Sequence, residues 1–282
     1  NFTDDFDTHV VAPYVAAHAA GRTPNPCVEC NRHLKFDRFL RRALQLGFDA
    51  VATGHHARVS SSGTRWQLRR GADAAKDQSY VLSMLGQEQL SRVRLPVGEL
   101  TKAEVRELAA ALGLRTAAKA ESQDVCFITS TGGRAAFLGS RIELHPARVL
   151  DAATGHAAGE VPALELVTVG QRRGMGNGGG ASGARRYAIS VDAVARTVVA
   201  GTEEDLLTDR LAVSTGGWSW TDEPVPVATV VSAQVSAHGT PRAAVLEADG
   251  GLAWLAPEPR VAPGQTVALY AGDRVLGSAI AA

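Results

Sequence analysis

Two cysteines, Cys27 and Cys30, lie two residues apart in the stretch TPNPCVECN. Thiols at this spacing suit half of a zinc site, a redox pair, or one part of a sulfur relay between thiols. Two prolines precede the pair and a helical pattern follows it, and the N-terminal end of a helix lowers the pKa of a thiol. We therefore favour a reactive thiolate here over two inert buried thiols.

A zinc site needs more ligands than this pair supplies. Structural zinc takes four ligands, and the chain has no second pair of cysteines at this spacing. His33 and either His55 or His56 would have to complete the set. We expect no permanently bound metal.

The third cysteine, Cys126, lies in the stretch ESQDVCFI, where Glu121, Ser122 and Asp124 precede an apolar step. Taken alone, such a cysteine is more often an inert core residue than a nucleophile. Three cysteines in 282 residues do not form a disulfide framework, and the odd number leaves at least one thiol free. A reducing compartment, the cytoplasm, fits this cysteine content best.

Two polar stretches accompany the cysteines. VATGHHARV has a glycine turn at the carboxyl end of an apolar run, where open α/β sheets bind ligands, so His55 and His56 are candidates to contact a phosphate or a base. Surface histidines beside a turn explain the pattern equally well. KDQSY, residues 76–80, by itself is typical of a solvated loop.

The elements that must position these residues alternate between helix and strand in the first half of the chain. Apolar residues from Leu34 to Leu46 predict a helix that stops at Gly47, and DAVATGHH predicts a short buried strand. Thr101 and Glu104 form a T-x-x-E capping box for a second helix, which ends at Gly113.

The pattern changes after Cys126. Residues 170–186 form a glycine-rich, basic loop between the strand-like stretches ALELVTV and RYAISVD. From about residue 209, short strands with turns at Gly250, Gly251 and Gly272 predict a small β-barrel. We expect an α/β domain over residues 1–136, a β-rich domain over 137–208 and the barrel over 209–282.

Composition narrows the choice of partners only slightly. Lys plus Arg equals Asp plus Glu, so binding to a nucleic acid would depend on local basic patches. No apolar run approaches the roughly 20 residues that span a bilayer. We expect a soluble, intracellular monomer with no membrane partner.

Taken together, six motifs resemble those of bacterial tRNA-specific 2-thiouridylases. The motifs are GRTPNPCVECNRHLKF, ATGHHAR, KDQSYVL, ESQDVCFI, TVGQRRGMG and PGQTVALYAGDRVLGSAI, in the order of that family. The resemblance runs over essentially the whole chain. It implies a Rossmann-like nucleotide-binding domain, a β-rich middle domain and a C-terminal β-barrel, and it favours the sulfur relay.

The resemblance also implies an activity and its residues. ATP, with Mg²⁺ as its counterion, adenylates the C2 oxygen of the wobble uridine in tRNA, and persulfide sulfur then displaces AMP to leave 2-thiouridine. A cysteine desulfurase or persulfide carrier supplies the sulfur. The carried-over roles are nucleophile for Cys30, persulfide carrier for Cys126, base pocket for Asn25, Pro26 and Cys27, nucleotide contact for Gly54, and tRNA contact for His55, Lys76, Asp77 and Gln78.

Three departures from the family pattern stand out. Family members have an aspartate, proposed as general acid or base, where this chain has Cys27. The Ser-Gly-Gly-Val-Asp-Ser type loop that cradles the ATP pyrophosphate is not among these residues, so we expect a 2-thiouridylase that lacks its N-terminal portion and does not adenylate tRNA by itself. The stretch QVSAHG offers only His238 where the family often holds RNA with basic and aromatic residues.

One alternative from another class stays open. The chain could be a non-catalytic module that binds tRNA or zinc. In the tRNA-binding case, the middle loop and the barrel would bind RNA through Arg172, Arg173, Arg185 and Arg186. Without the resemblance, we would assign those arginines to a solvated loop surface. Another ATP-dependent sulfur or amide transferase is a third reading, against which the motifs around Cys30 and Cys126 argue.

Overall fold

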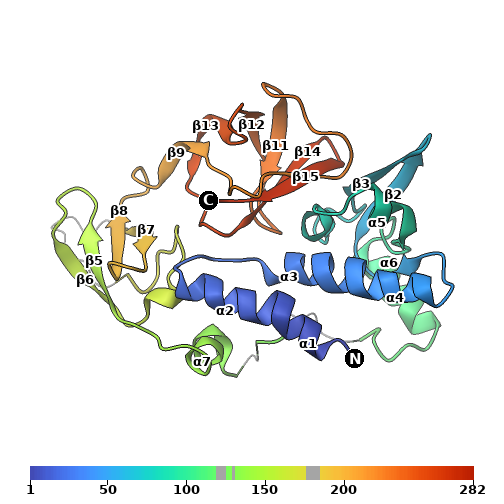
Figure 1. Cartoon of the computed structure of the whole chain (residues 1–282), viewed down its shortest axis with the longest axis horizontal. Coiled ribbons are helices and arrows are strands. Elements are labelled where there is room, and N and C mark those ends of the chain that lie inside the picture. The colour runs from blue at the N-terminus through green and yellow to red at the C-terminus, as the bar shows by residue number, and fades with distance from the viewer. Residues whose placement is uncertain (119–124, 129–130, 176–184) are drawn as a thin grey trace.

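The computed structural model describes residues 1–118, 125–128, 131–175 and 185–282. Figure 1 shows an N-terminal region of helices with a small sheet, a central β-sheet at one end of the molecule, and a C-terminal β-barrel above the helices. The α/β, β-rich and barrel architecture expected from the sequence is confirmed.

Two long helices lie side by side beneath the barrel (Figure 1). The first runs through α1 (Thr3–Phe6), a π-helical stretch (Asp7–Val11) and α2 (Ala12–Ala19). The second runs through α3 (Pro26–Glu29), a π-helical stretch (Cys30–Phe39) and α4 (Leu40–Gln45), and Gly47 follows it with φ +86°. The second helix begins well before the predicted Leu34, because Asn25 caps it and Pro26 suits its first turn.

The Rossmann-like region keeps a small parallel sheet. Strand β1 (Val51–Ala52) pairs with β4 (Val93–Arg94) and is shorter than the stretch DAVATGHH suggested. A 3-10 turn (Ser79–Leu82), α5 (Gln87–Arg92) and α6 (Lys102–Ala111) complete the region. The capping box of α6 is confirmed, since Thr101 N donates to Glu104 Oε2 at 2.7 Å and Glu104 N donates to Thr101 Oγ1 at 3.3 Å.

The barrel sheet recruits a hairpin from the first third of the chain. The order is β2-β3-β15-β14-β11-β12-β13-β9, with β10 beside β15. The turns expected at Gly250 and Gly272 have φ of +83° and +61°, the left-handed region that favours glycine. The strands are β2 (Ala57–Ser62), β3 (Arg65–Arg70), β9 (Leu207–Leu211), β10 (Ser219–Trp220), β11 (Val230–Gln234), β12 (Arg242–Leu246), β13 (Leu252–Pro259), β14 (Thr266–Ala271) and β15 (Arg274–Ile280).

The central sheet has the order β6-β5-β8-β7 and is preceded in the chain by α7 (Gly133–Gly139). Its strands are β5 (Ala147–Asp151), β6 (Ala157–Val161), β7 (Tyr187–Asp192) and β8 (Thr197–Gly201), so the strand expected in RYAISVD is confirmed. The strand expected in ALELVTV is wrong. Its residues form a 3-10 turn (Leu164–Leu166), because Leu164 packs into the core of this sheet while Glu165 turns back to accept a bond from His145 N at 3.0 Å.

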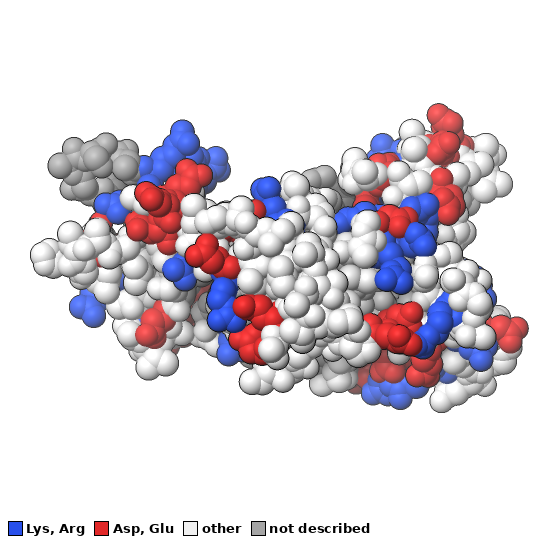
Figure 2. All heavy atoms as spheres, turned by 90° about the horizontal axis from the view of Figure 1, so that it is seen from above, with Lys and Arg blue, Asp and Glu red and all other residues white. Residues whose placement is uncertain are grey.

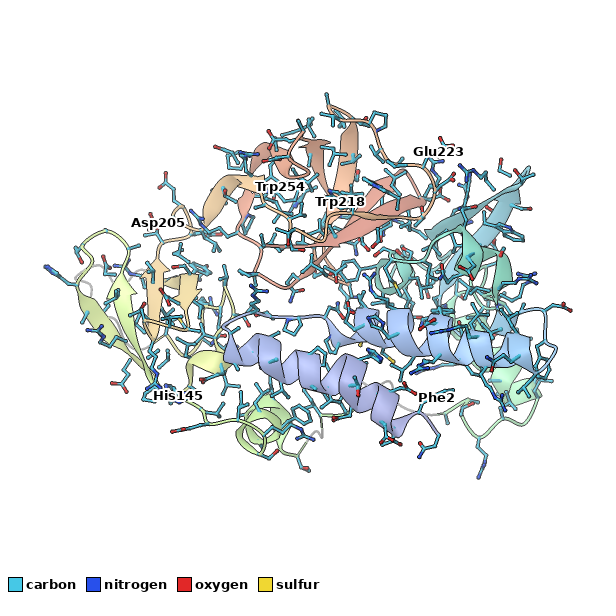
Figure 3. All side chains as sticks on the ribbon, viewed as in Figure 1. Phe2, His145, Asp205, Trp218, Glu223 and Trp254 are labelled. Carbon is cyan, nitrogen blue, oxygen red and sulfur yellow. The ribbon has the colours of Figure 1, made fainter. Side chains whose placement is uncertain are left out.

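One core joins the helices to the barrel. Phe36 and Leu40 of the second helix pack in the same buried cluster as Leu82 and as Tyr270 and Val275 of the barrel. A second cluster fills the barrel itself, where Trp218 and Trp254 lie (Figure 3). Because the first core crosses the boundary between the two regions, the barrel holds the helices in place.

The surface carries both signs of charge. Figure 2 shows acidic and basic side chains interleaved over the visible face, in keeping with the net charge of zero. Within the described residues, no helix combines the length and apolar character needed to cross a membrane.

Gly98 is buried, and its carbonyl accepts a hydrogen bond from Ala72 N at 2.9 Å, in the loop that leads to Lys76. A Cβ added at Gly98 would overlap the carbonyl oxygen of Ala57 at the start of β2. We expect Gly98→Ala to lower the free energy of unfolding by about 1–3 kcal/mol, because backbone must shift to make room. Urea unfolding would measure it, with Gly216→Ala as the control, since a Cβ there meets only Ser214 Oγ at 3.9 Å. Equal midpoints for the two variants would contradict the expectation.

Candidate active site

All three cysteines face one cavity of about 490 Å³. Its walls come from both long helices, the loop after β1, the loop before Ser79, the short segment 125–127 and the turn after β11. The polar and reactive groups on these walls include Cys27, Cys30, Lys35, His55, Gln78 and Cys126. The structure therefore brings together most of the residues singled out in the sequence.

Asn25 fixes the position of the cysteine pair. Its side-chain oxygen accepts from Cys27 N at 3.2 Å and from Val28 N at 3.4 Å, which caps the helix that carries both thiols. The Asn25 and Tyr80 side chains also share a hydrogen bond. Because Tyr80 is fully buried, this contact anchors the start of the helix to the protein core.

The thiol pKa values differ from the sequence-based expectation. Burial raises the pKa of Cys30, the Lys35 ammonium lowers it and Cys126 raises it again, with the net result above the ordinary value. Burial is also the main cause that raises the pKa of Cys27, and its thiol neighbours add to the effect. The rise in pKa that burial causes is therefore larger than the fall expected from the helix terminus. Both thiols stay largely protonated near neutral pH.

Aromatic packing brings Cys126 to the cavity. The next residue, Phe127, lies with its ring centroid 5.7 Å from that of Phe6, 5.4 Å from that of Tyr14 and 5.1 Å from that of Phe137. Cys126 itself is exposed and, like Cys27 and Cys30, is a free thiol. Cys126 raises the pKa of both other cysteines, so the three sulfur atoms lie within electrostatic range of one another. Glu121, Ser122 and Asp124 lie outside the described residues.

The loop after β1 supplies a glycine and a buried histidine. A Cβ added at Gly54 would meet no atom within 4 Å, so the backbone there borders open space. His55 is buried, and its Nδ1 lies 2.8 Å from Thr53 Oγ1. Burial, with Lys35 and His56 as smaller causes, lowers the pKa of His55 to about 4, so the ring is neutral near pH 7.

Asp77 organises the loop before Ser79. It accepts from Arg70 Nη1 at 2.7 Å, from Gly71 N at 3.0 Å, and from Ser79 N and Oγ, each at 3.0 Å. Its neighbour Gln78 is exposed and accepts from His56 N at 2.8 Å. The backbone N of Lys76 donates to Asp73 O at 3.0 Å. The tRNA contacts predicted for Lys76, Asp77 and Gln78 stay predictions.

Arg70 joins this loop to the barrel. Its Nη2 donates to Gln234 Oε1 at 2.9 Å, and its guanidinium carbon lies 3.7 Å from the centroid of the Tyr270 ring. Gln234 in turn donates to the carbonyls of Ser236 at 2.9 Å and Ala237 at 3.3 Å. Since Ala237 and His238 line the cavity, one guanidinium positions walls from two distant parts of the chain.

Sequence reasoning missed several wall residues. Phe6 and Val10 of the first helix line the cavity, and their acidic, helical surroundings gave no sign of this role. Lys35 was also missed, although its place five residues after Cys30 in the motif CNRHLKF offered a signal. His238, noted only as a weak RNA contact, lies on the wall as well.

No metal site accompanies the thiols in the described part of the chain. Within those residues, no group of three or more His, Cys, Asp or Glu side chains is placed to hold a metal ion. His33 instead approaches Glu29 Oε2 at 3.2 Å. The zinc reading therefore has no support from the described residues.

The arginines of the tRNA-module reading lie apart from the cavity. Arg172, Arg173 and Arg185 are exposed, whereas Arg186 pairs with Asp151 at 2.6 Å. The loop between them, residues 176–184, lies outside the described residues.

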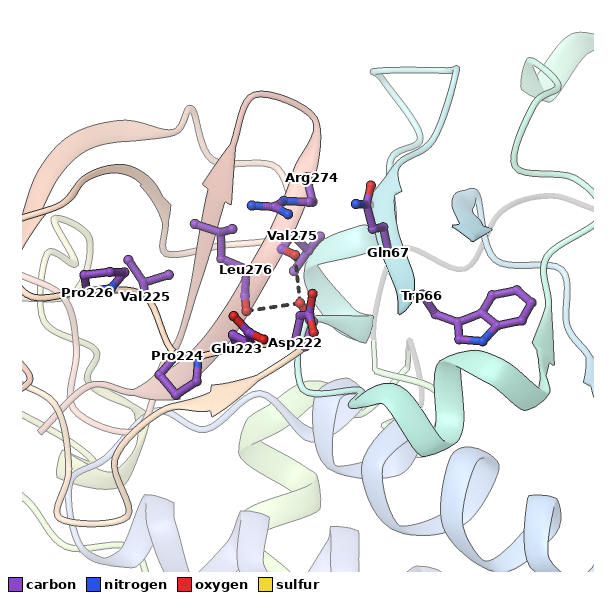
Figure 4. A pocket seen from close by; sticks show the side chains of 11 residues that line it. Trp66, Gln67, Asp222, Glu223, Pro224, Val225, Pro226, Arg274, Val275 and Leu276 are labelled. Carbon is purple, nitrogen blue, oxygen red and sulfur yellow. Dashed lines mark hydrogen bonds between the residues drawn. The ribbon is translucent and has the colours of Figure 1, made fainter. Parts of the chain in front are cut away.

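A second cavity, of about 230 Å³, lies where the β2–β3 hairpin meets the barrel (Figure 4). Its charged lining residues are Asp222, Glu223 and Arg274, and Thr221 Oγ1 donates to the carbonyls of Val275 and Leu276 at 2.9 and 3.1 Å. No cysteine lines it, so the candidate thiol site lies in the larger cavity.

Comparison with known proteins gives a consistent match. Residues 1–130 match the family model described as tRNA methyl transferase HUP domain, and residues 210–281 match the one described as Aminomethyltransferase beta-barrel domain. The tRNA-specific 2-thiouridylase MnmA of Rhodococcus jostii (strain RHA1) is 46% identical, over 99% of this chain and 77% of that protein. The protein of the same name from Thermobifida fusca (strain YX) is 43% identical, over 99% of this chain and 75% of that protein.

We expect the Arg70 to Asp77 pair to matter more for stability than an exposed pair. The Asp77 side chain is 7% exposed, so Asp77→Ala leaves a largely buried guanidinium without its partner and should cost about 3–5 kcal/mol. Glu223→Ala, which breaks an exposed pair with Arg65, is the matched control and should cost less than about 1 kcal/mol. Urea unfolding of both variants tests this, and similar losses would contradict it.

His55 should make stability depend on pH. Its pKa is about 4 in the folded protein and 6.5 ordinarily, so only the unfolded chain gains a proton between these values and stability falls as the pH drops through that window. His55→Gln should remove about 2 kcal/mol of the loss in unfolding free energy between pH 7 and pH 5. The exposed residue His156 provides the control variant, His156→Gln. An unchanged pH dependence in His55→Gln would refute the assignment.

Proposed function

The chain belongs to the tRNA-specific 2-thiouridylase family, and from this premise we propose that it is a tRNA-uridine 2-sulfurtransferase acting on C2 of the wobble uridine. One observation carries the proposal. Cys30 and Cys126, which are far apart in sequence, face the same cavity as free thiols. A sulfur relay needs two thiols that can approach one another.

Exposure separates the proposed roles of the two cysteines. Cys126 is exposed on a short segment held by Phe127, where a sulfur donor can reach it, and this supports its role as the persulfide carrier. Cys30 is half-buried near the helix start, which supports its role as the attacking thiol. The proposed donor is a cysteine desulfurase or another persulfide carrier.

The proposed transfer uses both sulfurs. The terminal sulfur of the Cys126 persulfide bonds to C2 of the activated uridine, and the Cys30 thiolate attacks Cys126 Sγ. The bond between Cys126 Sγ and the transferred sulfur breaks, its electron pair stays with the transferred sulfur, and the C2 to oxygen bond of the leaving group breaks. The products are 2-thiouridine, AMP and a Cys30 to Cys126 disulfide, which an external thiol reduces.

The cavity suits an extruded base. A volume of about 490 Å³ lies in the range of small-ligand sites, and a base must leave its stack to react. We assign Asn25, Pro26 and Cys27 to the base pocket, with His55 as a neutral tRNA contact. Lys76, Asp77 and Gln78 form the neighbouring loop of the proposed tRNA-binding surface.

The open backbone at Gly54 fits an adenine nucleotide. When bound, ATP with Mg²⁺ as its counterion supplies the adenylate leaving group on the uridine oxygen. Gly54 lies just beyond the carboxyl end of β1, and, apart from its chain neighbours, no atom of the described residues lies within 4 Å of the position that a Cβ would take there. The proposal includes no permanently bound metal. Free thiols suit the reducing cytoplasm. We also propose that the protein is a monomer.

Cys27 takes the place of the aspartate found in the family. Burial and the neighbouring thiols raise its pKa, so near neutral pH it holds a proton. A protonated thiol is a different catalyst from a carboxylate, so we assign Cys27 to the base pocket and carry over no acid or base role to it.

The relay predicts where sulfur appears. After incubation with a persulfide donor, mass spectrometry of the alkylated peptides should show one added sulfur on Cys126, and discharge should produce a Cys30 to Cys126 disulfide. Cys30→Ser should retain the persulfide on Cys126, because its attacking thiol is gone. Cys27→Ser is the matched control and should still form the disulfide.

The same experiment distinguishes the alternatives. Added sulfur on Cys27 rather than Cys126, or discharge at an equal rate in Cys30→Ser, would overturn the assigned roles. Stoichiometric zinc shielding Cys27 and Cys30 from alkylation would instead support a zinc-binding module.

A further inference from the structure

Lys35 faces the cavity that holds the three thiols, on the same helix as Cys30. It is the one Lys or Arg among the described residues on the cavity wall. In the part of the chain that the structure describes, no hydrogen bond or ion pair engages its ammonium group. A half-buried cation that has no anionic partner among the described residues, and that shares a cavity with ionisable thiols, calls for an electrostatic explanation.

The form of the helix explains how Lys35 comes close to Cys30. In an α-helix, residues five apart point about 140° away from one another. Residues 30–39 instead form a π-helical stretch, in which hydrogen bonds join residues five apart and each turn holds more residues. The wider turn brings Lys35 back toward the face that carries Cys30, and both side chains reach the same cavity.

We propose that Lys35 is a positioning residue that acts through Cys30, holding the Cys30 thiolate in the cavity as its fixed counter-charge. The role of that thiolate as the attacking group rests on the proposed function, whereas the electrostatic pairing does not. In support, Lys35 is the main cause that lowers the pKa of Cys30 and ranks directly after burial there, whereas for Cys27 it ranks last, after burial and the two other thiols.

Other groups around Cys30 do not replace this charge. His55 has its pKa lowered to about 4 and is neutral near pH 7. Asp77, which is negative, is engaged by Arg70, and Glu29 is engaged by Arg32 and His33. Among the described residues, the remaining titratable groups on the cavity wall are Cys27, Tyr80, Cys126 and His238.

The pH dependence of alkylation tests the proposal. Iodoacetamide labelling of Cys30, followed peptide by peptide by mass spectrometry, gives an apparent pKa for this thiol in the whole chain. In Lys35→Gln we expect that pKa to rise by about half to one unit, which lowers labelling near pH 7 roughly three- to tenfold. Lys35→Arg keeps the charge and should restore labelling close to the parent value.

Two controls separate electrostatics from misfolding. Lys102→Gln removes a lysine that does not line the cavity and should leave the Cys30 profile unchanged. The urea midpoint of Lys35→Gln should match that of the parent chain. Coincident Cys30 profiles in the parent and Lys35→Gln would overturn the proposal, as would an equal rise in Lys35→Arg. Since no tRNA, ATP or sulfur donor enters this assay, its failure is distinct from failure of the sulfur relay.

Discussion

The ion pair between Arg70 and Asp77 is the contact on which the cavity depends. Asp77 accepts hydrogen bonds from the backbone N of Gly71 and of Ser79. Arg70 donates to Gln234 and stacks on the ring of Tyr270, both in the barrel. Low exposure makes both partners costly to leave alone, because a buried charge without its counter-charge is poorly solvated. The loop that carries Gln78 and the turn that carries His238 therefore keep a fixed separation. The thiols meet inside the space that these two walls define.

Contacts between residues that are close in the sequence made part of the structure predictable. The capping box at Thr101 and the glycine turns at Gly250 and Gly272 involve residues only a few positions apart, so the sequence contains the whole interaction. The helix terminus at Asn25 also depends on local contacts, since a short side chain before a proline meets the free amides, but the prediction from apolar spacing placed the start at Leu34 and missed it. The cysteine motifs identified the family, since their spacing and order matched one family and the comparisons confirm it.

Long-range packing explains what could not be predicted. Nothing in the stretch around Phe127 reveals that Phe6, from the first helix, will hold it beside Cys30. The turn at Leu164 has the composition of a strand, but tertiary burial of its apolar side chains decides its form. The raised pKa of Cys30 also depends on burial, which a helix-terminus argument does not include.

The cavity has a consequence for the order in which the protein is made. Val10 is synthesised long before His238 and before Thr266, whose carbonyl accepts from the Tyr80 hydroxyl at 2.7 Å. Contacts between such distant segments form late, after the chain has closed a long loop. A nascent chain therefore displays its cysteines without a shared chamber around them. The sulfur relay that we propose would therefore become possible only after these late segments have packed against the helices.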